Sequence, residues 1–112
     1  MRRYNEVTIL AILNAIDYKI NRISLIMKYL NLSGTSARDY LDYLVEIGVI
    51  EKSSDGEYKL TEKGRRVLEL LREKRKIEVE LALVFIELAD LIGEHSGGIS
   101  SFIYRRFPRH LR

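Results

Sequence analysis

The sequence predicts a mainly α-helical chain with one small β-hairpin, an α+β class in which short helices, the hairpin and a long helix follow one another. Three observations support this class. Two short segments with helical apolar spacing flank a tight turn, residues 49–61 alternate with a period of two, and residues 62–94 hold a long apolar pattern without a proline. The 112 residues provide material for about one domain.

The first half of the chain is expected to hold three helices. An apolar stripe marks the first of them and comprises Val7, Leu10, Leu13, Ile16 and Ile20. Residues 25–30 and 37–47 repeat the helical spacing, and residues 31–34 form the turn between them. Ser33 suits the N-cap of the third helix because its hydroxyl can accept a first-turn N–H. Gly48 can end that helix in the left-handed conformation.

After Gly48 the apolar period changes from that of a helix to that of a strand. Residues 49–52 and 57–61 read as two strands, and residues 53–56 supply an Asp-Gly turn that tolerates positive φ. A helix, a turn, a second helix and a hairpin in this order are typical of a winged helix-turn-helix. The hairpin would be the wing.

The segment after the hairpin predicts one long helix and a homodimer. Thr61 suits its N-cap and no proline follows before Pro108, so a helix over residues 62–94 would be roughly 50 Å long. Its apolar residues follow heptad spacing with only Lys74 polar, which is typical of a coiled coil. The expected dimer interface comprises Val67, Leu70, Ile77, Leu81, Val84, Phe85, Leu88 and Leu91.

Residues 79–92 are too apolar for a two-stranded coiled coil. Only Glu80, Glu87 and Asp90 are polar there, so apolar side chains cover most of the helix circumference. We expect the partner's copy of this helix and the apolar stripe of the first helix to cover it. A membrane span is not expected, because the apolar band is shorter than about 18 uninterrupted residues and holds three carboxylates.

Residues 39–71 resemble small archaeal winged-helix DNA-binding proteins with a long dimerising helix. The resemblance depends on Tyr40, Leu41, Leu44, Gly48, Val49, Ile50, Tyr58, Leu60, Thr61, Lys63 and Gly64. It covers roughly residues 5 to 92 and is more specific for the fold than for the role. The expected organisation is a winged helix-turn-helix over residues 1–64, a dimerisation helix over 61–95 and a basic aromatic tail over 96–112. Abundant Arg, Lys, Glu, Ile and Leu, with no Gln or Trp, favour a thermophile source.

The charge distribution does not make the winged-helix part basic. The whole chain has a net charge of +3, yet residues 5–64 hold seven Lys or Arg against nine Asp or Glu, a net charge of −2. Arg2, Arg3 and residues 65–112 carry the positive excess. DNA binding would therefore depend on local basic patches.

Helix-turn-helix docking identifies the candidate DNA contacts. The first turns of the second helix of the motif meet base edges, so the candidate base contacts are Thr35, Ser36, Arg38 and Asp39. Arg38 ranks first, because a guanidinium can donate two hydrogen bonds to one guanine. The candidate backbone contacts are Lys28, Tyr43, Lys52, Lys59, Arg105, Arg106 and Arg109.

Other interpretations of these residues stay open. Arg38 could simply pair with Asp42 at i, i+4, Tyr43 could be an ordinary surface aromatic, and the wing could contact protein. Acidic residues at the wing tip, Asp55 and Glu57, would oppose DNA. The basic stretch Lys63, Arg65, Arg66, Arg72, Lys74, Arg75 and Lys76 is expected to be a solvated face rather than a phosphate track. In the tail, aromatic residues could anchor the chain while arginines are displayed.

Catalysis finds little support in the sequence. There is no cysteine, and His95 and His110 are the only histidines and have no metal-ligand spacing. The Gly97-Gly98 pair lacks the residues of a phosphate loop. No enzyme, metal, cofactor or small-molecule substrate is therefore expected. Without a signal peptide pattern at its start, the chain is expected in the cytoplasm, associated with the nucleoid.

Two functional hypotheses follow. The first is a dimeric double-stranded DNA-binding protein that acts as a transcriptional regulator, or alternatively as an architectural chromatin protein. The second is a protein–protein interaction module that uses the acidic surface of its winged helix to hold a basic partner. The net charge of −2 over residues 5–64 permits the second hypothesis.

Overall fold

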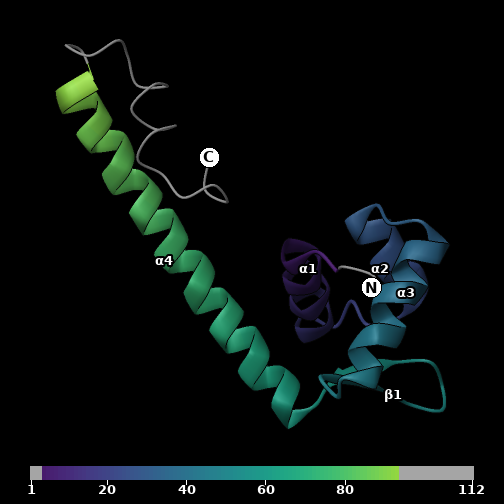
Figure 1. Ribbon diagram of the computed structural model, residues 1–112. Coiled ribbons are helices and arrows are strands. Elements are labelled where there is room, and N and C mark those ends of the chain that lie inside the picture. The colour runs from purple at the N-terminus through teal and green to yellow at the C-terminus, as the bar shows by residue number, and fades with distance from the viewer. Residues whose placement is uncertain (1–3, 94–112) are drawn as a thin grey trace. The chain divides into compact units, whose positions relative to one another are not determined.

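The computed structural model describes residues 4–93. Its elements are α1 (Glu6–Asp17), α2 (Ile23–Leu30), α3 (Gly34–Glu46), β1 (Ile50–Lys52), β2 (Tyr58–Leu60) and α4 (Glu62–Ile92) (Figure 1). The predicted class, mainly α with a small hairpin, is confirmed. The chain divides into two compact units after Arg72, and the first unit holds α1, α2, α3, the hairpin and the start of α4.

One hydrophobic core holds the first unit together. Every element of the unit contributes to it, and the contributors in α1 and α3 recur at spacings of three or four residues, so that each of these helices buries one face. Burial of a large aliphatic side chain stabilises a fold by about 1.5–3 kcal/mol. The core comprises Ile12, Leu13, Ile16, Ile26, Leu41, Leu44, Val49, Ile50, Tyr58 and Leu68.

Each of the first three helices is followed, within two residues, by a residue with positive φ, and the N–H of the next residue donates back into the helix. After α3 this residue is Gly48, with φ +80°, and the N–H of Val49 donates to the carbonyl of Leu44 at 3.1 Å. The predicted role of Gly48 is thus confirmed. Asn31 (φ +54°) ends α2 in the same conformation, and Lys19 (φ +69°) follows α1.

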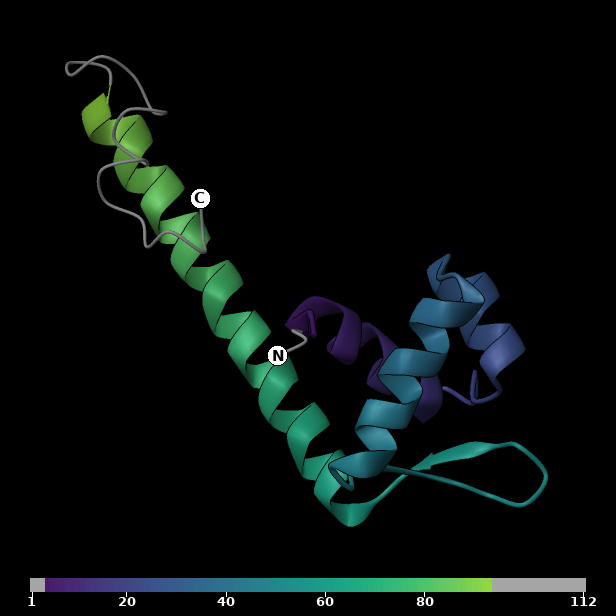
Figure 2. The same cartoon turned by 45° about the vertical axis from the view of Figure 1, so that its right-hand side comes forward.

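The hairpin is an antiparallel pair with a defined register. Ile50 lies opposite Leu60 and Lys52 lies opposite Tyr58. At the turn, Gly56 has φ +91°, in line with the predicted Asp-Gly turn. The N–H of Tyr58 donates to the carbonyl of Asn21 at 2.8 Å, so β2 is also tied to the segment between α1 and α2. Figure 2 shows the hairpin extending from the end of α3.

The passage from β2 to α4 is fixed by close contacts with the end of α3. Thr61 Oγ1 accepts the N–H of Gly64 at 3.0 Å, which confirms the predicted N-cap, and donates to the carbonyl of Gly48 at 2.6 Å. A Cβ on Gly64 would lie 1.8 Å from the carbonyl oxygen of Val49. Only glycine therefore fits this crossing of two backbones.

The role predicted for the apolar stripe of α1 is wrong. Leu13 and Ile16 are buried in the core of their own unit, so they are not available to cover residues 79–92. Val7 is 68% exposed, and Ile20 lies beyond the end of the helix. The face that α1 buries also includes Ile12 and Ala15, because the helix contacts α2 and β2.

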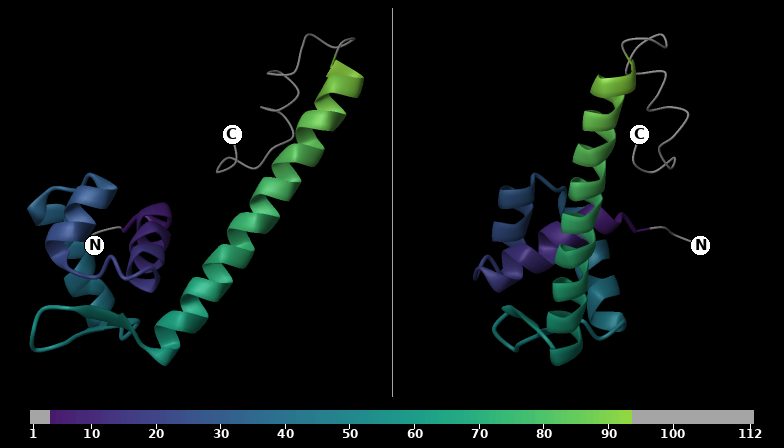
Figure 3. Two further views of the ribbon diagram at one scale, coloured as in Figure 1. Left: turned by 180° about the vertical axis from the view of Figure 1, so that it is seen from behind. Right: turned by 90° about the vertical axis from the view of Figure 1, so that its left-hand side faces the viewer.

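The second unit, as far as the structure describes it, is the continuation of α4. Residues 73–92 form one helix without a break (Figure 3). Many of its large apolar side chains are exposed in the single chain, namely Ile77, Val79, Leu81, Leu83, Val84, Ile86, Leu88, Leu91 and Ile92. Ala89 is buried. Among residues 4–93, no helix has the length and the apolar character that crossing a membrane requires.

Candidate nucleic-acid interface

The α2–turn–α3 motif holds the predicted base contacts on the first turns of α3. Ser33 Oγ accepts the N–H of Ser36 at 3.1 Å, so the start of the helix is capped as predicted. Thr35 and Arg38 are exposed, whereas Ser36 and Asp39 are half-buried. Lys28 is exposed in the last turn of α2. These are the positions from which a helix-turn-helix reaches base edges and backbone.

Arg38 is not engaged in the ion pair that was the alternative to DNA binding. Within residues 4–93, its guanidinium makes no ion pair within 4 Å, with Asp42 or with any other carboxylate. Burial raises the pKa of Tyr58, the charge of Asp42 raises it further, and Arg38 acts in the opposite direction. Arg38 and Asp42 of α3 therefore both act on the Tyr58 hydroxyl of β2.

The middle of the outward face of α3 is acidic. Asp39, Asp42 and Glu46 follow one another at spacings of three and four, so they share one face of the helix. That face lies opposite the buried side chains Ala37, Leu41 and Leu44. A DNA backbone would be repelled there, while a basic surface would be attracted. The positive charge of Arg38 lies at the edge of this acidic face.

Tyr43 belongs to an aromatic group that the sequence analysis missed. Its ring stacks on that of Tyr4, with centroids 4.0 Å apart and an interplanar angle of 10°. Tyr4 also contacts the edge of Tyr40 at 5.1 Å, and the Tyr40 hydroxyl accepts the N–H of Asn5 at 2.9 Å. One face of the Tyr43 ring is thus covered by the segment before α1. The sequence carried no periodic signal for Tyr4, because it precedes the first helix.

The two lysines of the wing point to opposite faces of the hairpin. Lys52 lies opposite Tyr58, and Lys59 lies opposite Glu51, so the two lysines belong to adjacent cross-strand pairs. Side chains of adjacent pairs alternate between the two faces of a hairpin. The Lys52 ammonium lies 5.8 Å from the centre of the Tyr58 ring. A flat surface that meets one of these lysines therefore does not meet the other.

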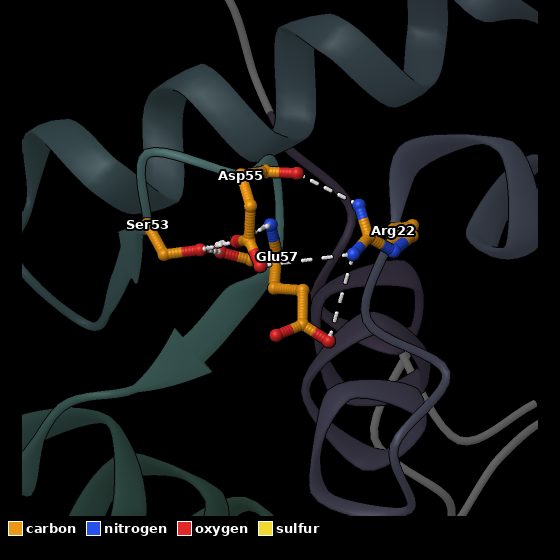
Figure 4. A network of polar contacts seen from close by, with 4 residues as sticks. All are labelled: Arg22, Ser53, Asp55 and Glu57. Atoms are coloured by element: carbon orange, nitrogen blue, oxygen red, sulfur yellow. Dashed lines mark hydrogen bonds and ion pairs between the residues drawn. The ribbon is translucent and has the colours of Figure 1, made fainter.

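The wing tip is held by Arg22, which lies just before α2 (Figure 4). Its guanidinium donates to the carbonyl of Asp55 at 2.8 Å and lies 3.8 Å from the Asp55 carboxylate and 3.9 Å from that of Glu57. Hydrogen bonds from the Ser53 hydroxyl and the Glu57 N–H, together with the charge of Arg22, lower the pKa of Asp55. The Arg22 guanidinium thus partly compensates the negative charge of the acids expected to oppose DNA at the tip. No sequence pattern links Arg22 to a turn 33 residues away.

Part of the basic stretch after the wing is used inside the first unit. Lys63 donates to the carbonyl of Ile47 at 2.6 Å, at the end of α3. Arg72 donates to Asn14 at 2.6 and 2.9 Å and lies 3.0 Å from the Asp17 carboxylate. Both side chains are nevertheless exposed, so the expectation of a solvated face stays a prediction. It fits Arg66, which pairs with Glu69 at the surface.

Arg105, Arg106 and Arg109 lie outside the described residues, so their role stays a prediction. Within residues 4–93, no group of His, Asp and Glu side chains is arranged to hold a metal ion. The candidate interface therefore consists of the start of α3, the end of α2 and one face of the wing.

Comparison with known proteins places the chain in a family. The family described as winged helix-turn-helix matches residues 2–79 of this sequence. The chain belongs to the winged helix-turn-helix family, as the residues of the hairpin and its flanking helices predicted.

The fold is also similar to a solved structure, that of IdeR from T. acidophilum. The TM-score is 0.54 and the sequence identity is 26%. The match covers 94% of this chain and 55% of that chain, so this chain spans little more than half the length of the protein it matches. No curated protein matches the sequence significantly.

Proposed function

We propose that this protein is a non-enzymatic, double-stranded DNA-binding regulator of transcription. Winged helix-turn-helix proteins present the first turns of α3 to the major groove, and Arg38 is the observation that carries the proposal. It is exposed on that part of α3 and has no ion-pair partner within residues 4–93. Its guanidinium is therefore available for two hydrogen bonds to guanine.

The other contacts follow from this docking. Thr35 and Ser36 would flank Arg38 at the bases, and Asp39 would accept a hydrogen bond from a cytosine amino group. Lys28 would bind phosphate from α2. From the wing, Lys59 or Lys52 would contribute, but not both to one surface. Arg105, Arg106 and Arg109 would add electrostatic affinity from the tail.

The proposed assembly is a homodimer held by α4. In the single chain, Ile77 is 53%, Val84 is 54% and Leu91 is 70% exposed, and all three lie on the heptad seam. A row of apolar side chains along a helix marks an association surface. We assign residues 61–95 to dimerisation, residues 1–64 to DNA binding and residues 96–112 to a basic tail. A dimer would place two recognition helices on one duplex, with a spacing that fixes the spacing of half-sites.

The test compares two substitutions of Arg38 by fluorescence anisotropy with specific and random duplexes. Arg38→Ala should narrow the difference between the two duplexes by about 1–3 kcal/mol if the guanidinium reads a base. Arg38→Lys keeps the charge but loses the two-pronged geometry, so it should narrow the difference almost as much. Lys28→Ala is the control and should weaken both duplexes alike. Equal weakening of both duplexes by Arg38→Ala would reduce Arg38 to a phosphate contact.

A second candidate function is supported by the acidic face of α3. Asp39, Asp42 and Glu46 could hold a basic protein, and the winged helix would then be an interaction module. Replacing the three acids by Asn, Asn and Gln separates the candidates. If DNA docks on α3, removing the repulsion should strengthen binding to random duplex. The slope of log affinity against log salt should stay as steep as in wild type. If wild type and the variant both fail to bind duplex at low salt, the interaction module is favoured.

A further inference from the structure

We propose that the first unit contains a phosphate-binding cleft that is separate from the recognition surface of α3. The cleft has a volume of about 410 Å³ and lies between the end of α1, the segment that follows it, β2 and the first turns of α4. Three cations line it, Lys19, Lys59 and Arg65. No residue of α3 lines it, so a ligand there would leave Arg38 and Thr35 accessible.

The three cations are not neutralised by their surroundings. Within the part of the chain that the structure describes, none of Lys19, Lys59 and Arg65 forms an ion pair within 4 Å. Two acids also line the cleft, Asp17 and Glu57. Each of these acids, however, has an arginine partner.

Those arginine partners come from outside the lining. Arg72 lies 3.0 Å from the Asp17 carboxylate, and Arg22 lies 3.9 Å from that of Glu57. Asp17 is therefore compensated, and Glu57 is compensated in part, because Arg22 also lies 3.8 Å from the Asp55 carboxylate; the cations of the cleft keep an excess of positive charge. A cleft with this excess attracts an anion, and a phosphoryl group offers several oxygens that ammonium and guanidinium groups can donate to.

Lys19 occupies a backbone position where its side chain is a disadvantage for folding. It has φ +69°, and its N–H donates to the carbonyl of Ile16 at 3.1 Å while the next N–H donates to Ala15 at 2.9 Å. Glycine is the usual residue at this helix end, because an L side chain is strained in the left-handed region. The comparable positions after α2 and α3 are held by Asn31 and Gly48. A lysine at the third such position is explained if its ammonium serves a ligand.

Because the backbone at Lys19 is strained, a glycine variant at this position should stay folded, so a loss of binding in it can be assigned to the missing ammonium group. Lys19→Gly removes a cation from the cleft and relieves the backbone at once, so the variant should unfold at a higher temperature than wild type. Asn31→Gly is the matched control, since it makes the same kind of backbone change outside the cleft. Arg65→Ala removes a second cation from the cleft. Its control is Arg66→Ala, which removes the neighbouring arginine, whose side chain pairs with Glu69.

Binding of inorganic pyrophosphate, measured by calorimetry in phosphate-free buffer at low salt, is the readout. Wild type should bind it saturably, and Lys19→Gly and Arg65→Ala should each weaken binding by about tenfold or more. The two controls should bind within about twofold of wild type. No saturable binding by wild type, or equal losses in the controls, would overturn the proposal. This arm contains no DNA, so its outcome is independent of the proposed function.

A second arm distinguishes the source of the phosphate. If the cleft takes a phosphate of the DNA backbone, Lys19→Gly should reduce the slope of log affinity for duplex against log salt by about 0.9 for each protomer, or about 1.8 for the proposed dimer. If it takes a free phosphorylated molecule, duplex binding by Lys19→Gly should match that of wild type in the absence of pyrophosphate. Either result supports the cleft once the calorimetry is positive, and together they assign its ligand.

Discussion

The first unit and the distal part of α4 use the same kinds of apolar residue in opposite ways. In residues 4–72, every element contributes an apolar side chain to one buried core, and Ile12, Leu41 and Leu44 are completely inaccessible. In residues 73–92, side chains of the same types are exposed by 39–70% in the single chain. The apolar side chains of the first unit are buried by one another. Those of residues 73–92 are not, and because exposed apolar area of this extent is unfavourable in water, we expect another surface to cover them.

The residues that carry the family resemblance also differ in role from the candidate DNA contacts. Gly48, Thr61, Lys63 and Gly64 all act on the backbone around the end of α3, as cap, hydrogen-bond donor or close contact. Among the candidate DNA contacts within residues 4–93, the structural contacts lie elsewhere, such as the Ser36 N–H in the cap of α3 and the Tyr43 ring in its stack with Tyr4. The motif therefore predicts the fold strongly and the ligand weakly, since its residues are needed for any function that the fold supports.

The largest expected effect tests whether the distal part of α4 associates along its heptad seam. Leu81→Lys combined with Leu88→Lys should raise the dimer dissociation constant by at least a factor of about a thousand, since burial of each leucine contributes about 1.5–3 kcal/mol. Sedimentation equilibrium measures it. Val79→Lys with Ile86→Lys is the control, because these side chains are similarly exposed at 42% and 44% but lie off the seam.

The control variant shows how much of the circumference of α4 is covered in the assembly. If both double variants dissociate, the whole apolar circumference is covered in the assembly and the association is more than a two-stranded coiled coil. A wild-type chain that sediments as a monomer at all concentrations would refute the dimer.

The next effect tests how strictly the first unit is fixed. Gly64→Ala should destabilise it by about 3 kcal/mol or more, because the added methyl group would collide with a backbone oxygen that cannot rotate away. Gly34→Ala is the matched control in another helix. Its Cβ would meet only the end of Met27, at 3.5 Å, so it should be neutral or stabilising by up to about 1 kcal/mol. Urea unfolding measures both, and equal stabilities would contradict the role assigned to the α4 crossing.

Much of the fold was predictable because its signals are local. The N-caps at Ser33 and Thr61, the left-handed end at Gly48 and the Asp-Gly turn each depend on residues within a few positions of one another. The buried face of α1 was harder to predict. Its apolar residues fit more than one helical stripe, and only the contacts with α2 and β2 select Ile12 and Ala15.

The polar contacts of the candidate site depend on distant partners. Arg22 meets the wing tip 33 residues away, and Arg72 meets Asn14 across 58 residues. Periodicity carries no information about such pairs, because an exposed arginine satisfies the same pattern whether it binds solvent, carboxylate or DNA. The fold therefore decides which of the many cations remain available, and the sequence alone does not.

The smallest effect tests the link between α3 and the wing through the ionisation of Tyr58. Burial raises the pKa of this phenol above its ordinary value of about 10, the charge of Asp42 raises it further, and Arg38 lowers it. Asp42→Asn should therefore lower the pKa and Arg38→Ala should raise it, as measured by nuclear magnetic resonance of labelled tyrosine rings. Asp39→Asn is the control, because it lies on the same face of α3 without acting on Tyr58.

The sign of the stability change with pH follows from the direction of this shift. Because the pKa is raised in the folded state, the neutral phenol contributes its full stability below about pH 10, and that contribution is lost as pH rises through the folded-state pKa. Asp42→Asn should lose less stability than wild type over this alkaline range, and Arg38→Ala should lose more. If Tyr58 titrates in both variants as it does in wild type, the two side chains do not act on the wing. The recognition surface would then be electrostatically separate from the hairpin, and substitutions in α3 and in the wing should have additive effects on DNA affinity.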